Sequence, residues 1–248
     1  RDFKHIVMAA AVNDHLLSIE GKKLKVTGGF FENELPEMLS LNMISGTRDL
    51  HDPASILLAA STAKAYFGNN NPVNKIITID QMPPVKVTGV YEDLPYNSSF
   101  TNLKFVATWD LFYTVNNVND TDDPWRPNFT TLYVQLNEGA DIDAVNARIK
   151  DAKLKKVNPE LAKKKPALFL HPMSQWHLFS EFKEGKNVGG AIQYVWMFGI
   201  IGVFVLLLAC INFMNLSTAR SEKRAKEVGI RKTMGSLRKQ IIGQFFSE

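Results

Sequence analysis

The chain has 248 residues, 45% of them hydrophobic, which is enough to bury the core of one or two domains. Its net charge of +4 is unevenly placed: residues 188–248 hold eight Lys/Arg and three Asp/Glu, which leaves 21 basic and 22 acidic residues in the larger part. That distribution argues against a nucleic-acid surface on the larger part. The single cysteine, Cys210, excludes an intrachain disulfide.

The first 187 residues are predicted to form a mixed α/β domain of short elements. Strands are expected at residues 6–12, 24–27, 75–80, 85–91, 103–107 and 130–136, with a short apolar run at 55–59. The alternating segments KIITID and VKVTGVY are separated by two prolines, which predicts a hairpin. Ser61 is expected to cap a short helix that Gly68 ends, and residues 109–115 to form a second short helix.

The clearest helix of this part is predicted at residues 141–156, with Asp141 as its N-cap and apolar residues at helical spacing. Residues 134–136, this helix and residues 167–170 are predicted to form one β-α-β unit. Polar residues at 69–72, at 116–128 and at 163–165 indicate exposed turns or loops.

The C-terminal part contains a predicted membrane-spanning helix. Residues 187–219 carry no charge, and residues 194–216 read YVWMFGIIGVFVLLLACINFMNL. About 20 predominantly apolar residues cross ~30 Å of hydrocarbon, whereas a buried core helix, the alternative, rarely reaches this length without a charge. Asn212 and Asn215 are expected to face other helices.

Residues typical of membrane interfaces flank the predicted span. Tyr194 and Trp196 lie at its N-terminal end, where aromatic residues gather at headgroup level. Arg220, Lys223 and Arg224 follow its C-terminal end. The positive-inside rule makes that end cytoplasmic, so residues 1–187 are expected outside the cytoplasm. An upstream membrane helix is expected to carry them there.

The segment after the span is predicted to be a helix, a turn and a second helix. Helix formers dominate residues 219–227, Gly229 is expected to interrupt the helix, and Gly235 to end or bend it. Residues 241–246 then restart an apolar pattern directed back to the membrane.

A basic anchor for anionic lipid is the alternative interpretation of this segment. Such an anchor needs charge alone. Val228, Ile230 and Met234 are interleaved with the charges, and they are expected to form an apolar face that a partner covers.

The sequence holds no motif of a common catalytic or metal site. A P-loop and the HExxH, GxSxG and CxxC motifs are absent, and Gly28-Gly29 is too short for a phosphate cradle. His51-Asp52 suggests a metal-ligand pair, but a loop hydrogen bond is the favoured interpretation. The chain is therefore predicted to be non-catalytic, with no catalytic, cofactor-binding or metal residues.

Two sets of residues carry a resemblance to a known family. Glu227-Val228-Gly229-Ile230-Arg231-Lys232, followed by Gly235, match the run E-[VI]-G-[IV]-R-[KR]-x-x-G. This run resembles the permease domain of FtsX-like and MacB-like ABC transporters, in particular Bacteroides-type versions. Upstream, a second set of residues matches the pattern of the family's periplasmic core domain. These are Pro53, residues 55–58, Ser61, Ala63, residues 66–68, Pro72, Lys75, residues 87–90 and residues 93–98. Ala60 departs from it, because many relatives carry Glu there.

The resemblance implies an inner-membrane permease with four spans. Residues 1–187 would be the extracytoplasmic core domain, residues 188–219 the second span, and residues 220–248 a cytoplasmic coupling segment and the start of the next span. Such permeases work as homo- or heterodimers with a cytoplasmic ABC ATPase that binds the ATP. They pass its movement outward by mechanotransmission to export or extract substrates. Membrane lipid and a periplasmic or outer-membrane protein are further expected partners, and nucleic acid is not.

The resemblance also assigns roles in the coupling segment. Val228 and Ile230 would dock on the ATPase, and Arg231 and Lys232 would pair with its acidic rim. Glu227, Gly229 and Gly235 complete the expected coupling region.

Two other functions remain as alternatives. A sensor or signalling receptor would also have an outside domain and one span, but it would usually continue as a coiled coil in the cytoplasm. An anchored enzyme would need titratable groups converging in a pocket.

Overall fold

The computed structural model describes residues 2–19, 21–118, 125 and 129–235. The chain divides into two compact units, Arg1–Leu170 and His171–Glu248. The first is the predicted mixed α/β domain, and the second ends in one long apolar helix.

Six strands of the first unit pair into a closed ring. Around the ring the order is β2 (Asn13–Ile19), β3 (Lys22–Phe31), β8 (Phe105–Thr108), β5 (Ser55–Ala59), β7 (Val85–Tyr91) and β6 (Ile76–Ile79), and β6 pairs with β2 again. The pairs β3–β8 and β5–β7 are parallel, and the other four are antiparallel. β4 (Met43–Gly46) adds to β7 outside the ring. Closure leaves these six strands with few free edges.

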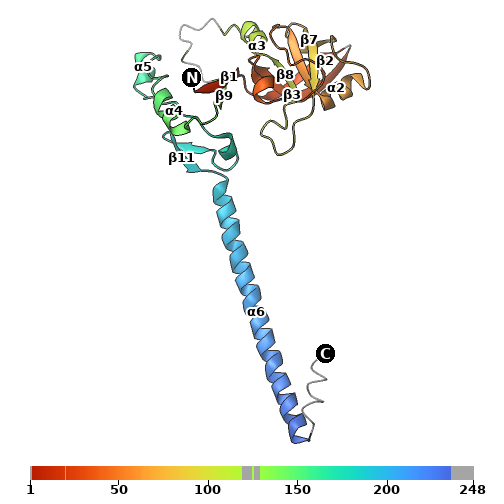
Figure 1. Ribbon diagram of the computed structural model, residues 1–248, viewed down its shortest axis with the longest axis vertical. Coiled ribbons are helices and arrows are strands. Elements are labelled where there is room, and N and C mark those ends of the chain that lie inside the picture. The colour runs from red at the N-terminus through yellow and green to blue at the C-terminus, as the bar shows by residue number, and fades with distance from the viewer. Residues whose placement is uncertain (1, 20, 119–124, 126–128, 236–248) are drawn as a thin grey trace. The chain divides into compact units, whose positions relative to one another are not determined.

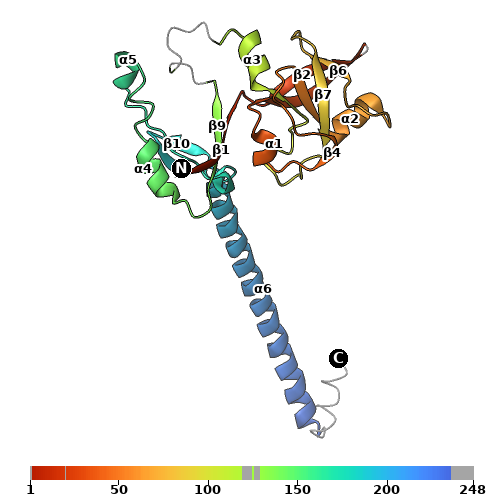
Figure 2. The ribbon, with the colours of Figure 1, turned by 45° about the horizontal axis from the view of Figure 1, so that its top comes forward.

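Apolar side chains of the ring form the core. It includes Leu17, Ile19, Phe30, Ile56, Leu58, Ile77, Ile79, Val85, Val87 and Phe105, each at most 7% exposed. Burying one such side chain stabilises the fold by about 1.5–3 kcal/mol. Two short helices pack on the ring, α2 (Ala60–Phe67) on β5 and β7 and α3 (Trp109–Val115) on β3 and β8 (Figures 1 and 2).

The Gly28-Gly29 pair serves packing in this core. A Cβ added at Gly28 would lie 2.3 Å from the ring of Phe105, closer than any real contact. The close approach of β3 to β8 therefore requires glycine at this position.

The helix ends agree with the predicted signals at two of three positions. Gly68 ends α2 with φ +61°, and Asp141 caps α4 (Ile142–Ile149) by accepting a bond from the Asp143 N–H. The predicted Ser61 cap is wrong, because α2 begins at Ala60 and its N-cap is Ala59, two residues before Ser61.

A two-stranded ribbon leads away from the ring. β1 (Phe3–Ala9) pairs antiparallel with β9 (Thr131–Leu136), and only the Ala9 end of β1 also pairs with β3. α1 (Leu35–Met38) follows β3, and α4 and α5 (Pro159–Ala162) follow β9.

Several predicted elements differ from the structure. The helix predicted at 141–156 ends at Ile149, and residues 167–170 are not a strand. The amides of Leu168 and Leu170 instead bond to Lys150 O and to Asn146 Oδ1, so α4 itself holds this segment and the predicted β-α-β unit is wrong. β2 was not predicted. Most of the predicted loop at 116–128 and all of 241–246 lie outside the described residues.

The second unit begins with a compact segment and continues as one helix. A short 3-10 turn, η1 (Met173–Gln175), is followed by the hairpin of β10 (Glu181–Lys183) and β11 (Lys186–Gly189). α6 (Ile192–Thr233) then runs for 42 residues (Figure 1).

Candidate functional site

The long helix α6 is exposed along its apolar part. Its most apolar 18-residue window has a mean hydropathy of 2.6, and none of it is buried within the structure. Phe204, Leu208 and Phe213 are 62%, 65% and 71% exposed. A core helix would bury these side chains against its own chain, so this helix is built to be covered by lipid or by other helices.

The predicted interfacial aromatics lie at the start of this helix. Tyr194 and Trp196 fall in its first two turns and are 64% and 70% exposed. Exposed amphipathic rings at the first turns of a span suit the headgroup level, where their polar atoms reach water.

Thr218 satisfies its hydroxyl within the helix. Its Oγ donates to Met214 O, four residues earlier, at 2.9 Å. This bond lets a hydroxyl lie in or near hydrocarbon without a partner from another helix. Thr218 therefore does not by itself indicate a helix–helix contact.

The helix continues beyond the predicted span without a break. Gly229 lies inside α6, so the expected interruption there is wrong. Its φ is not positive, and an added Cβ would meet nothing within 4 Å. Residues 220–233 extend the helix by about 21 Å at ~1.5 Å per residue. Arg220, Lys223 and Arg224 lie on this extension, all exposed.

Helical continuity divides the expected apolar face. Residues two apart point to nearly opposite sides of a helix, whereas residues four apart share a side. Ile230 and the C-cap Met234 therefore share one side, 52% and 80% exposed, and Val228 lies on the other, partly buried. Glu227 and Arg231 are also four residues apart, so they share a side of the helix as well.

Gly235 ends the helix as predicted. Its φ is +88°, and its N–H bonds to Lys232 O at 3.3 Å. Arg231 and Lys232 occupy the last turn, where positive charge favours the C-terminal end of the helix dipole. The seven residues of the expected coupling region thus form one helix end, exposed except at the partly buried Val228, and helical spacing alone sets their arrangement.

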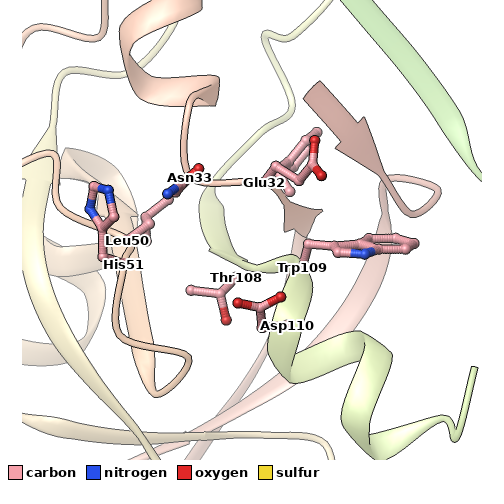
Figure 3. Close-up of a pocket in the computed structure, with 8 residues that line it drawn as sticks. Glu32, Asn33, Leu50, His51, Thr108, Trp109 and Asp110 are labelled. Carbon is pink, nitrogen blue, oxygen red and sulfur yellow. The ribbon is translucent and has the colours of Figure 1, made fainter. Parts of the chain in front are cut away.

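The first unit holds a small open pocket of about 150 Å³. Leu50 and His51 lie on one side, Glu32 and Trp109 on the other, and Thr108 and Asp110 between them (Figure 3).

Intrachain bonds already engage three of the polar side chains that line this pocket. His51 Nδ1 lies 2.8 Å from Asp49 Oδ1, Glu32 Oε2 accepts the Met8 N–H, and Thr108 donates to Pro53 O. His51 thus makes the loop hydrogen bond that was favoured over a ligand pair, though with Asp49 and not Asp52. The described residues contain no group of three His, Cys, Asp or Glu that could hold a metal ion.

Comparison with known families accounts for both units. The profile of the MacB-like periplasmic core domain matches residues 2–152, and that of the FtsX-like permease C-terminal domain matches residues 199–248. The first match includes the strand ring, and the second includes most of α6.

Individual relatives agree with the family matches. The macrolide export ATP-binding/permease protein MacB of Mannheimia succiniciproducens is 23% identical over 208 residues, which is 81% of this chain and 28% of that protein. MacB of Salmonella paratyphi A is 24% identical over 194 residues, 78% of this chain and 27% of that protein. The chain thus spans under a third of the length of these relatives.

A solved structure shares the fold. A domain of a putative permease protein from Porphyromonas gingivalis superposes with a TM-score of 0.54 at 19% identity, over 67% of this chain and 70% of that one.

Proposed function

The chain belongs to the family of MacB-like and FtsX-like ABC transporter permeases, and from this premise we propose that it couples a cytoplasmic ATPase to an extracytoplasmic domain. The protein lies in the inner membrane, with its periplasmic core domain outside the cytoplasm and α6 as a span. ATP would be bound by the ATPase and not by this chain.

The observation that carries the proposal is the unbroken length of α6. Its 42 residues extend about 63 Å at ~1.5 Å per residue, roughly twice the ~30 Å of hydrocarbon. A single helix that begins outside the membrane and ends well inside the cytoplasm can pass a displacement from one side to the other. This is the geometry that mechanotransmission requires.

The cytoplasmic end of α6 would contact the ATPase through two kinds of side chain. Ile230 and Met234 offer an exposed apolar side, and Arg231 and Lys232 offer charge beside it. An acidic surface with an apolar pocket on the ATPase would complement both. The other four residues of the coupling region lie outside that apolar side: Glu227, Val228 and Gly229 are within the last turns of α6, and Gly235 ends it.

The proposal includes a second permease subunit, because permeases of this family work as dimers. Its helices would cover part of the exposed apolar surface of α6, and lipid would cover the rest. In this proposal the ATPase drives the movement of the outside domain, and the assembled transporter uses that movement to export or extract a substrate. A periplasmic or outer-membrane protein would act as a further partner of the outside domain.

The receptor alternative shares the outside domain and the continuous helix. What supports the permease is the match of residues 199–248 to the FtsX-like permease domain and the end of the helix at Gly235, where a signalling coiled coil would continue.

The test is a charge reversal at the end of α6. We expect Arg231→Glu in the intact transporter, purified from native membranes, to weaken ATPase association by roughly tenfold or more, because repulsion from an acidic rim replaces attraction. Lys155→Glu is the matched control, since it makes the same charge change at an exposed lysine of the first unit, away from the cytoplasmic end of α6. Equal ATPase recovery and activity in both variants would overturn the coupling assignment.

A further inference from the structure

The hairpin of residues 181–189 is fixed to the first turn of α6; we call it the juxtamembrane hairpin. One hydrogen bond joins them directly, from Gln193 Nε2 to Val188 O at 3.2 Å. Two more join each of them to the segment before the hairpin: Ile192 N–H bonds to Leu178 O at 3.1 Å, and Asn187 Nδ2 bonds to Phe179 O at 2.6 Å. Figure 1 shows the hairpin projecting sideways from the start of the helix.

Gly190 makes this junction tight. Its φ is +134°, and an added Cβ would lie 3.0 Å from Ser180 N and 3.1 Å from Leu178 O. The start of the helix is therefore held close to residues 178–180, directly before the hairpin, so the depth of the span in the membrane sets the depth of the hairpin.

That depth is the headgroup layer. Residues 194–216 extend about 35 Å as a helix, slightly more than the ~30 Å of hydrocarbon, so the hydrocarbon begins near Tyr194 and Trp196. β11 ends at Gly189, only five residues before Tyr194. The headgroup layer is roughly 5–8 Å thick on each side, and five residues rise at most about 7.5 Å, so the hairpin leaves the helix in the outer part of this layer.

The two faces of the hairpin differ. Phe182 pairs with Asn187, and these two face the preceding segment, where Phe182 stacks edge-on against His171 and Asn187 bonds to Phe179 O. Lys183 pairs with Lys186 on the opposite face, because side chains alternate along a strand.

The two lysines of this face form no ion pair with the described residues, although Glu181, two positions before Lys183 on the same strand, also lies on it. Lys183 and Lys186 are exposed and directly opposite, an arrangement that destabilises an isolated hairpin. Glu181 and Glu184 are the nearest acidic residues in sequence, and Val188, 39% exposed, continues the face toward the helix.

We propose that this face binds the phosphate groups of phospholipids at the extracytoplasmic membrane surface. A phosphate between Lys183 and Lys186 would relieve their repulsion through two charge-assisted hydrogen bonds, while Val188 rests against the acyl boundary. Lipid is the occupant because the surface is continuous with the span and lies at headgroup depth.

The experiment measures the depth of the hairpin in a membrane. Cys210 is the only cysteine of the chain, so Cys210→Ser gives a background for one nitroxide label at Glu184→Cys in the hairpin turn. The chain is reconstituted in phosphatidylcholine/phosphatidylglycerol vesicles, and the accessibility of the label to a water-soluble nickel chelate is compared with that at Tyr96→Cys, which is 93% exposed on the other unit.

We expect the label at residue 184 to be protected relative to the label at residue 96. Lys183→Glu with Lys186→Glu should abolish this protection, since each lysine near an anionic surface shifts the bound population by roughly fivefold. Lys183→Gln with Lys186→Gln should reduce it less, and Lys155→Glu with Lys156→Glu, two exposed lysines elsewhere, should leave it unchanged.

Equal accessibility of the labels at residues 184 and 96 would overturn the assignment, and so would protection that survives the double reversal. A third contrary result would be protection that does not depend on the vesicles and that soluble inorganic phosphate abolishes. The measurement needs no ATPase, so its outcome is independent of the proposed transport function.

Discussion

The carboxylate of Asp93 accepts both the backbone N–H and the hydroxyl of Ser61, at 2.8 and 2.6 Å. Lys104 Nζ forms an ion pair with the same carboxylate at 2.6 Å. Ser61 lies in the first turn of α2, where backbone N–H groups lack helical partners. Asp93 thus caps this helix from a loop 32 positions later in the chain, which gives a physical reason for both residues in the family pattern.

Removing this charge should destabilise the first unit. We expect Asp93→Asn to lower the free energy of unfolding by about 1–2 kcal/mol, the usual cost of losing a helix cap and a charged hydrogen bond. Chemical denaturation of the chain in detergent, followed by circular dichroism, measures it. Glu138→Gln, an exposed acidic residue in a turn, is the control and should be neutral.

The same substitution predicts a pH dependence. Burial alone would raise the pKa of Asp93, but the hydrogen bonds from Lys104 and Ser61 bring that pKa below its ordinary value of 3.8. Such a group stabilises the fold above its unfolded pKa, and the effect is lost as the pH falls through the lower folded pKa. The difference in stability between wild type and Asp93→Asn should therefore be complete at neutral pH and shrink below about pH 4. A constant difference down to lower pH would contradict this role.

Gly89 should resist substitution because of a close backbone approach. A Cβ at this position would lie 2.3 Å from Thr47 O and 2.6 Å from Met43 Cε, so β4 could not pair with β7 unchanged. We expect Gly89→Ala to cost about 1–3 kcal/mol, measured by the same denaturation. Gly68→Ala meets no atom within 4 Å but has φ +61°, so it isolates the conformational cost, about 1 kcal/mol. Equal costs would show that the clash relaxes.

Tyr91 predicts an alkaline limit of stability. It is fully buried and donates its hydroxyl to Leu103 O at 2.9 Å. Burial, with a smaller contribution from Asp93, raises the pKa of the Tyr91 phenol well above 10. Because the unfolded chain releases this proton at about pH 10 and the folded chain does not, stability should fall as the pH rises above 10.

The free energy of unfolding is measured as a function of pH, and the absorbance of the tyrosine phenolate is followed as a second readout. Tyr91→Phe should lower stability by about 1 kcal/mol at neutral pH and reduce the alkaline loss. A Tyr91 phenolate that forms without unfolding would contradict this interpretation.

The sequence was most informative where structure is decided locally. The hairpin of β6 and β7, the helix at 109–115, the Asp141 cap and the Gly68 stop each depend on neighbouring residues, and each is confirmed. The span of α6 also follows from one uninterrupted apolar run.

Elements fixed by distant contacts were not predictable in this way. β2 reads NDHLLSI, half polar, and is a strand because β3 and β6 pair with it on both sides. The closure of the ring has no signal within any one strand. The juxtamembrane hairpin does have a local signal, because Glu184 and Gly185 form a two-residue turn with φ +49° and +74° between its two short strands.

The continuity of α6 gives the last prediction, at Gly229. Sequence reasoning placed a break there, since glycine costs about 1 kcal/mol relative to alanine inside a helix. The structure continues through it to Thr233 with open space around the Cα. Gly229→Ala should therefore raise the helical content at this end and leave ATP-dependent activity of the intact transporter unchanged. Gly229→Pro, which breaks the helix, should abolish coupling while the outside domain stays folded. Gly229→Ala could instead lose coupling while the ATPase stays bound. This result would mean that α6 bends at Gly229, or that Gly229 comes into close contact with the ATPase during the cycle, and α6 would then not act as a rigid rod.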